Sequence, residues 1–381
     1  MRILIVSAYF PPHVGGVEVV AEHQAAMLAA AGHEVVVATT RSDRALPARE
    51  RIDGYTVERL PAADVVERRL RIPYPLVGVA FGRALWRLVR WCDAVHIHDV
   101  LYLPSQLAAV FARRASKPLY ATQHVGPVNH HHRFVVAVER AVNAVAGGYI
   151  WRQARRVVSH NRMVHDHLRA NGVPPEKILP ATIGIDTRRF SPGAAGGTGQ
   201  RAPSGKPVAL FVGRLVYKKG FHHLVRAGSP DYQIVAAGSG EPPVPVPDTV
   251  TCVGPVSRDD LVAWYRSATV FVLPSTGEMF PLVVQEAMAC GLPVVLTDDP
   301  RYDDYGIDRA LLRLVPAEPA ALRRAVTEIV LDPGLRARMS EYSRRIAVER
   351  FDSGLSRTAQ VAIYDQPVSA PASRLTGSAT R

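Results

Sequence analysis

The stretch VFVLPSTGEMFPLVVQEAMACGLPVVLT, residues 270–297, decides the fold. Its two ends, 270–274 and 294–297, are short apolar runs of the kind that form buried parallel strands. The segment between them, 281–290, starts with proline and is followed by glycine, which predicts a helix. A strand, a helix and a strand in this order form a βαβ unit, and a βαβ unit requires a parallel sheet.

The same alternation extends outward from this unit in both directions. The second half of the chain contains further predicted strands at 208–212, 233–237 and 249–253, and predicted helices at 221–227, 259–267, 319–330 and 335–351. The first half contains predicted strands at 2–7, 34–40, 94–97, 118–122 and 157–159, and predicted helices at 17–31 and 104–114. The sequence therefore predicts an α/β protein with two doubly wound, Rossmann-like domains.

The domain boundaries follow from length and composition. A chain of 381 residues suits two domains, and residues 191–204, SPGAAGGTGQRAPS, have the small and polar composition of an exposed linker. We expect an N-terminal domain at 1–190, a linker at 191–205, a C-terminal domain at 206–352, a return helix to the N-terminal domain at 353–366 and a disordered tail at 367–381. Open parallel sheets bind ligands at the carboxyl ends of their strands, so two facing domains would form the site in the cleft between them.

Composition narrows the compartment and the partners. Cys92, Cys252 and Cys290 form no closely spaced pair, which argues against a disulfide framework or a zinc site and indicates a reducing, cytoplasmic compartment. No apolar stretch reaches the roughly 18 residues of a transmembrane helix. The formal net charge of +12 predicts attraction to anions such as nucleotides, phosphates, nucleic acid or anionic lipid.

Two loops carry residues suited to phosphates. Gly15 and Gly16 precede a predicted helix, where glycine lets backbone N–H groups approach a phosphate, although a tight turn explains the pair equally well. Arg214 and Lys219 lie between a predicted strand and a predicted helix, where two cations can neutralise a diphosphate leaving group. A solvated basic turn is the alternative for this second pair.

Two carboxylates, Glu278 and Glu286, stand eight positions apart in the deciding stretch. Each can accept two hydroxyl hydrogen bonds, which suits one to a sugar and the other to a ribose. A helix-start charge stabilised by the helix dipole would also explain Glu278. That alternative explains Glu286 less well, because its neighbours on the helix are apolar: Val283, Val284, Ala287 and Met288.

These segments together resemble family 4 of the retaining glycosyltransferases, also called group 1, which have the GT-B fold. The resemblance covers about residues 1–364. EMFPLVVQEAMACGLPVV (278–295) is similar to the family's paired-glutamate signature, and GRLVYKKG (213–220) is similar to its diphosphate-binding loop. Three further segments resemble family loops: ATIGIDTRRFSP (181–192), AAGSG (236–240) and VGPVS (253–257).

The resemblance implies a role for each matching position. Glu278 would hold hydroxyls of the transferred sugar beside the backbone of Phe280 and Pro281, Glu286 would bind the ribose, and His124 would contact the donor sugar. The implied donor-binding residues are Gly15, Gly16, Arg214, Lys219, Glu278, Met279, Phe280, Pro281 and Glu286. The implied catalytic residues are His124, Arg214, Lys219 and Glu278.

The chain departs from the family pattern at three places. Met279 stands where glycine is common, which would reshape the sugar pocket. Residues 297–308, TDDPRYDDYGID, replace a frequent Gly-Gly stretch and a further glutamate, which puts nucleotide contacts from that loop in doubt. Val125 follows His124 where aspartate is frequent.

The resemblance implies transfer of a hexosyl unit, with retained configuration, from a UDP- or GDP-linked sugar to a hydroxyl of a glycan or a lipid-linked acceptor. Cell-surface polysaccharide or glycolipid synthesis is the expected setting. No metal and no cofactor is expected, because Arg214 and Lys219 supply the positive charge and no Asp-x-Asp motif occurs. Two alternatives stay open: a nucleotide-sugar epimerase, and a non-catalytic anion- or nucleic-acid-binding protein. No nucleic-acid motif is recognised, so a nucleic-acid partner is not expected.

Other histidines and basic stretches allow further interpretations. His96 and His98 would lie on one side of a strand end as a possible metal pair, but the flanking sequence favours a structural role. The run at 130–132 is interpreted as exposed and polar. Basic and aromatic residues alternate at 65–91 and 134–156, which fits either peripheral contact with an anionic membrane on its cytoplasmic face or a solvated helix surface.

Overall fold

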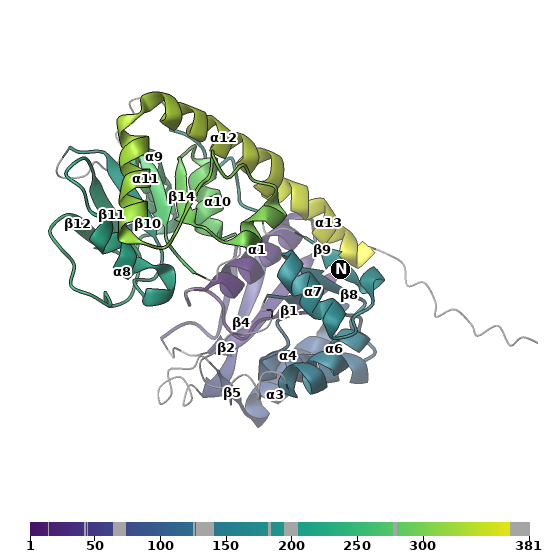
Figure 1. Cartoon of the computed structure of the whole chain (residues 1–381). Coiled ribbons are helices and arrows are strands. Elements are labelled where there is room, and N and C mark those ends of the chain that lie inside the picture. Colours follow the sequence, from purple (N-terminus) through teal and green to yellow (C-terminus); the bar gives the residue numbers. More distant parts are fainter. Residues whose placement is uncertain are drawn as a thin grey trace, which may run out of the picture. The chain divides into compact units, whose positions relative to one another are not determined.

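The computed structural model of the chain describes residues 1–13, 15–41, 43, 45–63, 74–124, 126, 141–181, 184–193, 205–276 and 280–365. The chain packs as two compact units, which Figure 1 shows from the purple N-terminus to the yellow C-terminal helix. Unit 1 contains Met1–Ala181 together with the chain from Arg357 on, and unit 2 contains Thr182–Ser356. Each unit is built on its own largely parallel sheet, which confirms the predicted α/β class.

The described part of unit 1 contains a nine-stranded sheet in the order β3-β4-β2-β1-β6-β7-β8-β9, with β5 paired to β4. Its strands are β1 (Arg2–Val6), β2 (Glu34–Arg41), β3 (Arg49–Ile52), β4 (Tyr55–Ala63), β5 (Leu76–Val77), β6 (Ala94–His98), β7 (Leu119–Gln123), β8 (Arg156–Ser159) and β9 (Ile178–Pro180). β3 and β5 pair antiparallel with β4, whereas β1 pairs parallel with both β2 and β6. The chain continues to one side of β1 through β2 and to the other side through β6, so β1 marks a topological switch point.

Helices pack on this sheet because their apolar faces are buried against it. They are α1 (Gly16–Ala30), α3 (Val79–Trp91), α4 (Leu103–Arg114), the π-helix η1 (Asn143–Gly147), α6 (Gly148–Gln153), α7 (Arg162–Ala170) and the 3-10 turn η2 (Pro175–Lys177). Leu28 of α1 lies in one core cluster with Ile3 and Ile5 of β1. The last helix, α13 (Ser353–Asp365), adds Ile363 and Tyr364 to the same cluster.

The described part of unit 2 contains a six-stranded parallel sheet in the order β12-β11-β10-β13-β14-β15. Its strands are β10 (Val208–Val212), β11 (Gln233–Ala237), β12 (Val250–Gly254), β13 (Val270–Leu273), β14 (Val294–Thr297) and β15 (Arg313–Val315). In chain order this is the 3-2-1-4-5-6 arrangement of a Rossmann fold, and its switch point lies between β10 and β13.

The helices of unit 2 follow the predicted pattern closely. They are η3 (Tyr217–Lys219), α8 (Phe221–Leu224), η4 (Val225–Ala227), α9 (Arg258–Ser267), α10 (Leu282–Ala289), η5 (Pro300–Tyr305), α11 (Pro319–Leu331) and α12 (Pro333–Phe351). The central strands β10, β13 and β14 read as continuous apolar runs because both sheet faces are covered. No helix in the described ranges combines the length and apolar character needed to cross a membrane.

The division between the units falls before the boundary predicted at residue 190. The backbone of Ile185 accepts a hydrogen bond from Ser353 and donates one to Phe351, each 2.8 Å long. Phe190 is buried in the core cluster of unit 2. Residues 184–190 therefore pack with the second unit, although no change in composition marks the point. Residues 194–204 of the predicted linker and the predicted tail at 367–381 lie outside the described residues.

Candidate functional site

The switch point of unit 2 brings together the loops after β10 and β13. β10 pairs with β11 on one side and with β13 on the other, so the two loops diverge from the carboxyl edge of the sheet. The loop after β10 carries Arg214 and Lys219, and the loop after β13 leads to Glu278. The fold thus brings to one edge of unit 2 the starts of two of the segments to which the resemblance assigns donor binding.

Close backbone approaches hold these loops in one arrangement. A Cβ on Gly238, after β11, would lie 1.9 Å from the carbonyl oxygen of Gly213. A Cβ on Gly220, whose φ of +72° is left-handed, would lie 1.9 Å from the carbonyl oxygen of Pro274. Two backbone hydrogen bonds, of 2.9 and 3.1 Å, join the same loops: Leu215 N–H to Ser239 O, and Thr276 N–H to Lys218 O. Only glycine fits the two crowded positions, so the edge is rigidly built.

The two predicted cations lie on this loop. Arg214 is exposed and forms no ion pair with another described residue. The Cδ atom of Lys219, which is partly buried, lies 3.9 Å from the position of a Cβ on Gly213. The Lys219 side chain therefore runs back over the start of the loop, toward the residue before Arg214.

The two predicted residues Glu278 and Met279 lie outside the described residues. Phe280 follows them, and its buried ring stacks on Phe351 with 4.8 Å between centroids. The Phe280 carbonyl oxygen accepts a hydrogen bond of 3.0 Å from Gln285 Nε2. The Phe280 side chain therefore packs in the core of unit 2 just before α10. Pro281 is the N-cap of α10 and not its first helical residue, which corrects the predicted helix start by one position.

Glu286 is buried on α10, with 5% of its surface exposed. Its Oε2 atom accepts a hydrogen bond of 3.0 Å from the hydroxyl of Tyr265, which is fully buried on α9. A buried carboxylate needs such a donor because burial removes the water that would otherwise stabilise its charge. Tyr265 was not among the predicted site residues, and its apolar surroundings on α9 give no sequence signal for this role.

The switch point of unit 1 carries the predicted glycine pair. Gly15 is the N-cap of α1, and a Cβ there would lie 2.2 Å from the Oε2 atom of Glu18, so the position is explained by packing. Glu18 in turn forms an ion pair of 2.7 Å with His13 Nδ1. A Cβ on Gly16 would meet nothing within 4 Å. Protein packing therefore does not explain Gly16, and the space beside it is open to a ligand.

His124 follows β7 at the same carboxyl edge and is partly exposed. Its Nε2 atom lies 2.9 Å from Nδ1 of His98, the last residue of β6. His98 Nε2 lies 2.8 Å from Oε1 of Gln24 on α1. On its other side, the His124 ring lies 5.2 Å, centroid to centroid, from the ring of His160 after β8. The ends of three neighbouring strands thus present a row of imidazoles.

Burial keeps these imidazoles neutral. Loss of water lowers the pKa of His98 and of His124 well below the ordinary value, and the neighbouring histidines lower both further. Burial also lowers the pKa of His160 to about 4 and that of His96, next along β6, to about 3. Near neutral pH each ring therefore has one N–H donor and one lone-pair acceptor.

Comparison with known proteins shows the same two-part organisation. The family model described as "Glycosyltransferase Family 4" matches residues 14–189, and the model described as "Glycosyl transferases group 1" matches residues 199–346. The chain is 30% identical to the D-inositol 3-phosphate glycosyltransferase of Acidothermus cellulolyticus, over 85% of this chain and 80% of that protein. It is also 30% identical to the GDP-mannose-dependent alpha-mannosyltransferase of Mycolicibacterium smegmatis, over 90% of this chain and 93% of that protein.

The chain belongs to family 4 of the glycosyltransferases. Its fold is GT-B: the sucrose-phosphate synthase of Thermosynechococcus elongatus superposes with a TM-score of 0.77 at 22% identity, covering 96% of this chain and 98% of that one. This assignment confirms the predicted family and favours the transferase over the epimerase and nucleic-acid alternatives.

In this family 4 glycosyltransferase, His96 and His98 lie on one side of β6, as predicted, with 5.4 Å between ring centroids. Both rings are occupied by protein hydrogen bonds. No group of three or more His, Cys, Asp or Glu side chains within the described ranges is arranged to hold a metal ion. The histidines at 130–132 lie outside those ranges.

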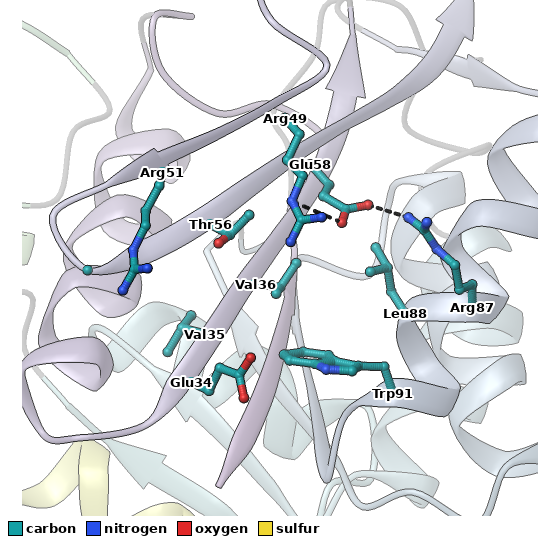
Figure 2. A pocket seen from close by; sticks show the side chains of 11 residues that line it. Glu34, Val35, Val36, Arg49, Arg51, Thr56, Glu58, Arg87, Leu88 and Trp91 are labelled. Carbon is teal, nitrogen blue, oxygen red and sulfur yellow. Dashed lines mark hydrogen bonds and ion pairs between the residues drawn. The ribbon is translucent and has the colours of Figure 1, made fainter.

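A pocket of about 310 Å³ lies at the opposite edge of unit 1 (Figure 2). It is lined by residues at the start of β2, including Glu34, and by Trp91 at the end of α3. In Figure 2, Arg49 and Arg87 flank Glu58 from two sides. Because β2 is parallel to β1, this pocket faces the amino ends of the strands and is separate from the edge that carries His124.

Proposed function

We propose that this glycosyltransferase moves a hexosyl unit from a nucleoside-diphosphate sugar to a hydroxyl of a glycan or lipid-linked acceptor, with retention of configuration. The observation that carries the proposal is the locked set of loops at the switch point of unit 2. These loops hold Arg214 and Lys219 at the sheet edge where Rossmann domains bind nucleotides. The relative that depends on GDP-mannose supports a nucleotide-linked donor, with GDP as one base to test.

The chemistry assigned to the two cations is stabilisation of the leaving group. During transfer the bond between the sugar C1 and the diphosphate oxygen breaks, and a bond from the acceptor oxygen to C1 forms on the same face. The acceptor proton passes to an oxygen of the departing diphosphate. Negative charge grows on that diphosphate, and preorganised cations lower the barrier most at the site where charge develops. We further propose that Arg214 and Lys219 make a metal ion and a cofactor unnecessary.

The open space at Gly16 gives unit 1 a place where a phosphate or hydroxyl oxygen could bind. A ligand that approached this position would meet backbone N–H groups at the start of α1, which favour phosphate and hydroxyl oxygens. His124 lies at the same carboxyl edge of this sheet, where the ends of three neighbouring strands carry imidazoles. We assign to His124 a contact with the transferred sugar, and to Glu278 the hydroxyls of that sugar.

The first experiment is a thermal-shift and hydrolysis screen against UDP-, GDP- and ADP-sugars, with chelator in place of added metal. Stabilisation by one nucleotide-sugar, with slow release of its diphosphate, is the expected result and names the donor. Product anomers resolved by NMR then test retention. If no donor stabilises the protein, or if release requires a divalent metal, the donor or the metal-independent part of the proposal is wrong.

We also propose that α3 touches an anionic membrane that carries the acceptor. Arg83 and Arg90 are exposed on this helix, and Val79 at its start is 72% exposed. A basic helix face with an exposed apolar residue fits a headgroup layer. Flotation with vesicles of anionic and of neutral phospholipid tests this: binding to the anionic vesicles alone, lost in Arg83→Glu with Arg90→Glu, is expected. Equal flotation of the wild type and the variant would refute it.

A further inference from the structure

The hydrogen-bond chain behind His124 determines which of its ring nitrogens carries the proton. We propose that His98 and Gln24 are positioning residues that hold His124 as the tautomer with hydrogen on Nε2. His124 Nδ1 is then a lone-pair acceptor offered to a hydroxyl of the sugar. The role toward a sugar rests on the proposed function, whereas the tautomer is a property of the resting protein.

The direction of the chain starts at the Gln24 amide. Its Oε1 atom, which can only accept, lies 2.8 Å from His98 Nε2, so His98 carries its hydrogen on Nε2. A neutral imidazole has only one N–H, so His98 Nδ1 must accept. The atom that faces it at 2.9 Å is His124 Nε2, which must therefore donate. His124 is left with a bare Nδ1, for which no partner occurs among the described residues.

The same amide orientation also satisfies the far side of Gln24. Its Nε2 atom donates toward His96 Nε2 over a longer 3.4 Å contact, and the Thr122 hydroxyl lies 2.7 Å from the same nitrogen. With Nε2 accepting, His96 carries its hydrogen on Nδ1 and donates it to the Tyr364 hydroxyl at 2.5 Å. Every junction then joins a donor to an acceptor. Turning the amide by half a turn would reverse all of them, so the amide sets the tautomer of the whole row.

The network is placed to act on His124 and on little else. Gln24, His96 and His98 are buried, with 3% or less of their surface exposed, whereas His124 is the partly exposed member. Buried polar groups are costly unless every one is satisfied, and here each satisfied pair restricts the next. A chain of this kind fixes ring orientation and proton position at its one accessible end.

With this tautomer, His124 places a hydrogen-bond acceptor, and not a cation, beside the sugar. Glycosyl transfer builds positive charge at the anomeric carbon and ring oxygen. A neutral ring nitrogen that accepts a hydrogen bond from a sugar hydroxyl raises the electron density on that hydroxyl oxygen and stabilises such charge. An imidazolium or an N–H donor at the same place would oppose it. The chain therefore suits His124 to the transition state and not only to the ground state.

The test is ¹⁵N NMR of the imidazole rings in the full-length protein labelled at histidine, with His124→Gln to assign the His124 signals. The expected result is hydrogen on Nε2 and a lone-pair shift at Nδ1 in the wild type. His98→Leu removes the ring nitrogen that accepts from His124 Nε2, and Gln24→Leu removes the amide that fixes the tautomer of His98. Each variant should convert His124 to a mixture of tautomers. His98→Asn keeps an amide oxygen near the lost Nδ1 and should restore the wild-type pattern. A folded wild type with hydrogen on Nδ1, or a His124 signal unchanged by both leucine variants, overturns the proposal.

Kinetics separates this inference from the proposed function. Once a donor is known, His98→Leu should lower kcat about tenfold, the effect of one hydrogen bond made in the transition state, with the donor KM little changed. His98→Asn should recover most of the rate. If no donor is turned over, the proposed function fails, and the NMR result still decides the tautomer. Loss of activity in His98→Leu without recovery in His98→Asn would make the role merely structural.

Discussion

Gly238→Ala should damage the proposed donor site without touching a ligand. The new Cβ would lie 1.9 Å from the carbonyl oxygen of Gly213, and contacts below 3.0 Å do not occur, so the two loops must separate by at least 3.0 − 1.9 = 1.1 Å. Gly213 directly precedes Arg214, so the cation moves with it. A misplacement of about 1 Å in a positioned group can cost roughly 100-fold in rate. We therefore expect kcat/KM for donor turnover to fall by about two orders of magnitude.

The control is Gly172→Ala, after α7 in unit 1. Gly172 also has a positive φ, +78°, but a Cβ there would meet nothing within 4 Å. Both positions have a positive φ at which an L side chain is strained, and only Gly238→Ala also bears the clash. Thermal unfolding identifies the folded fraction before steady-state kinetics are compared. Rates of the two variants within twofold of each other would refute the link between loop spacing and turnover.

Three further predictions concern catalysis by Lys219, donor binding by Glu286 and the stability of the protein in acid. Lys219→Ala should lower turnover at least about 100-fold, the effect of one lost contact to a developing anion, and near-normal steady-state turnover would remove the leaving-group role. Glu286→Ala should weaken donor binding in calorimetry, and unchanged affinity would contradict a ribose contact for this carboxylate. The stability of the folded protein should fall in acid. Burial lowers the pKa of His96 to about 3 and the pKa of His160 to about 4, against 6.5 for an unfolded chain. The stability that these two neutral rings contribute is therefore complete above about pH 6.5 and is lost as the pH falls toward 4. Urea midpoints measured from pH 8 to pH 4 test this, and His160→Gln should flatten the fall; an unchanged pH slope would speak against it.

Much of the fold could be predicted from the sequence because parallel strands buried on both faces are continuous apolar runs. β10, β13 and β14 were found in this way. The helices α4 and α11, each with a proline in its first turn, were also predicted. The hairpin of β3 and β4 was missed because it lies at the sheet edge and mixes charged with apolar residues. The unit boundary was misplaced because Ile185 joins unit 2 through backbone hydrogen bonds, which leave no trace in composition.

The places of the candidate site residues in the fold could be predicted where they depend on local sequence. Arg214, Lys219 and the glycine pair stand in loops that a strand–helix pattern locates, and the structure places each at a carboxyl edge. Gln24 and Tyr265 could not be found in this way, because each reaches its partner across the fold: Gln24 lies 74 positions from His98, and Tyr265 lies 21 from Glu286. Such partners are defined by packing and not by spacing along the chain.

The shared core of α13 and β1 has a consequence for the order in which the chain is completed. Ile363 and Tyr364 pack with Ile3 and Ile5, so a strand that is translated before unit 2 shares a core with a helix that is completed after it. At about 5–20 residues per second, unit 1 must wait on the order of ten seconds or more while unit 2 is translated. The second unit can therefore close before the first, and nascent unit 1 exposes an apolar face during that interval.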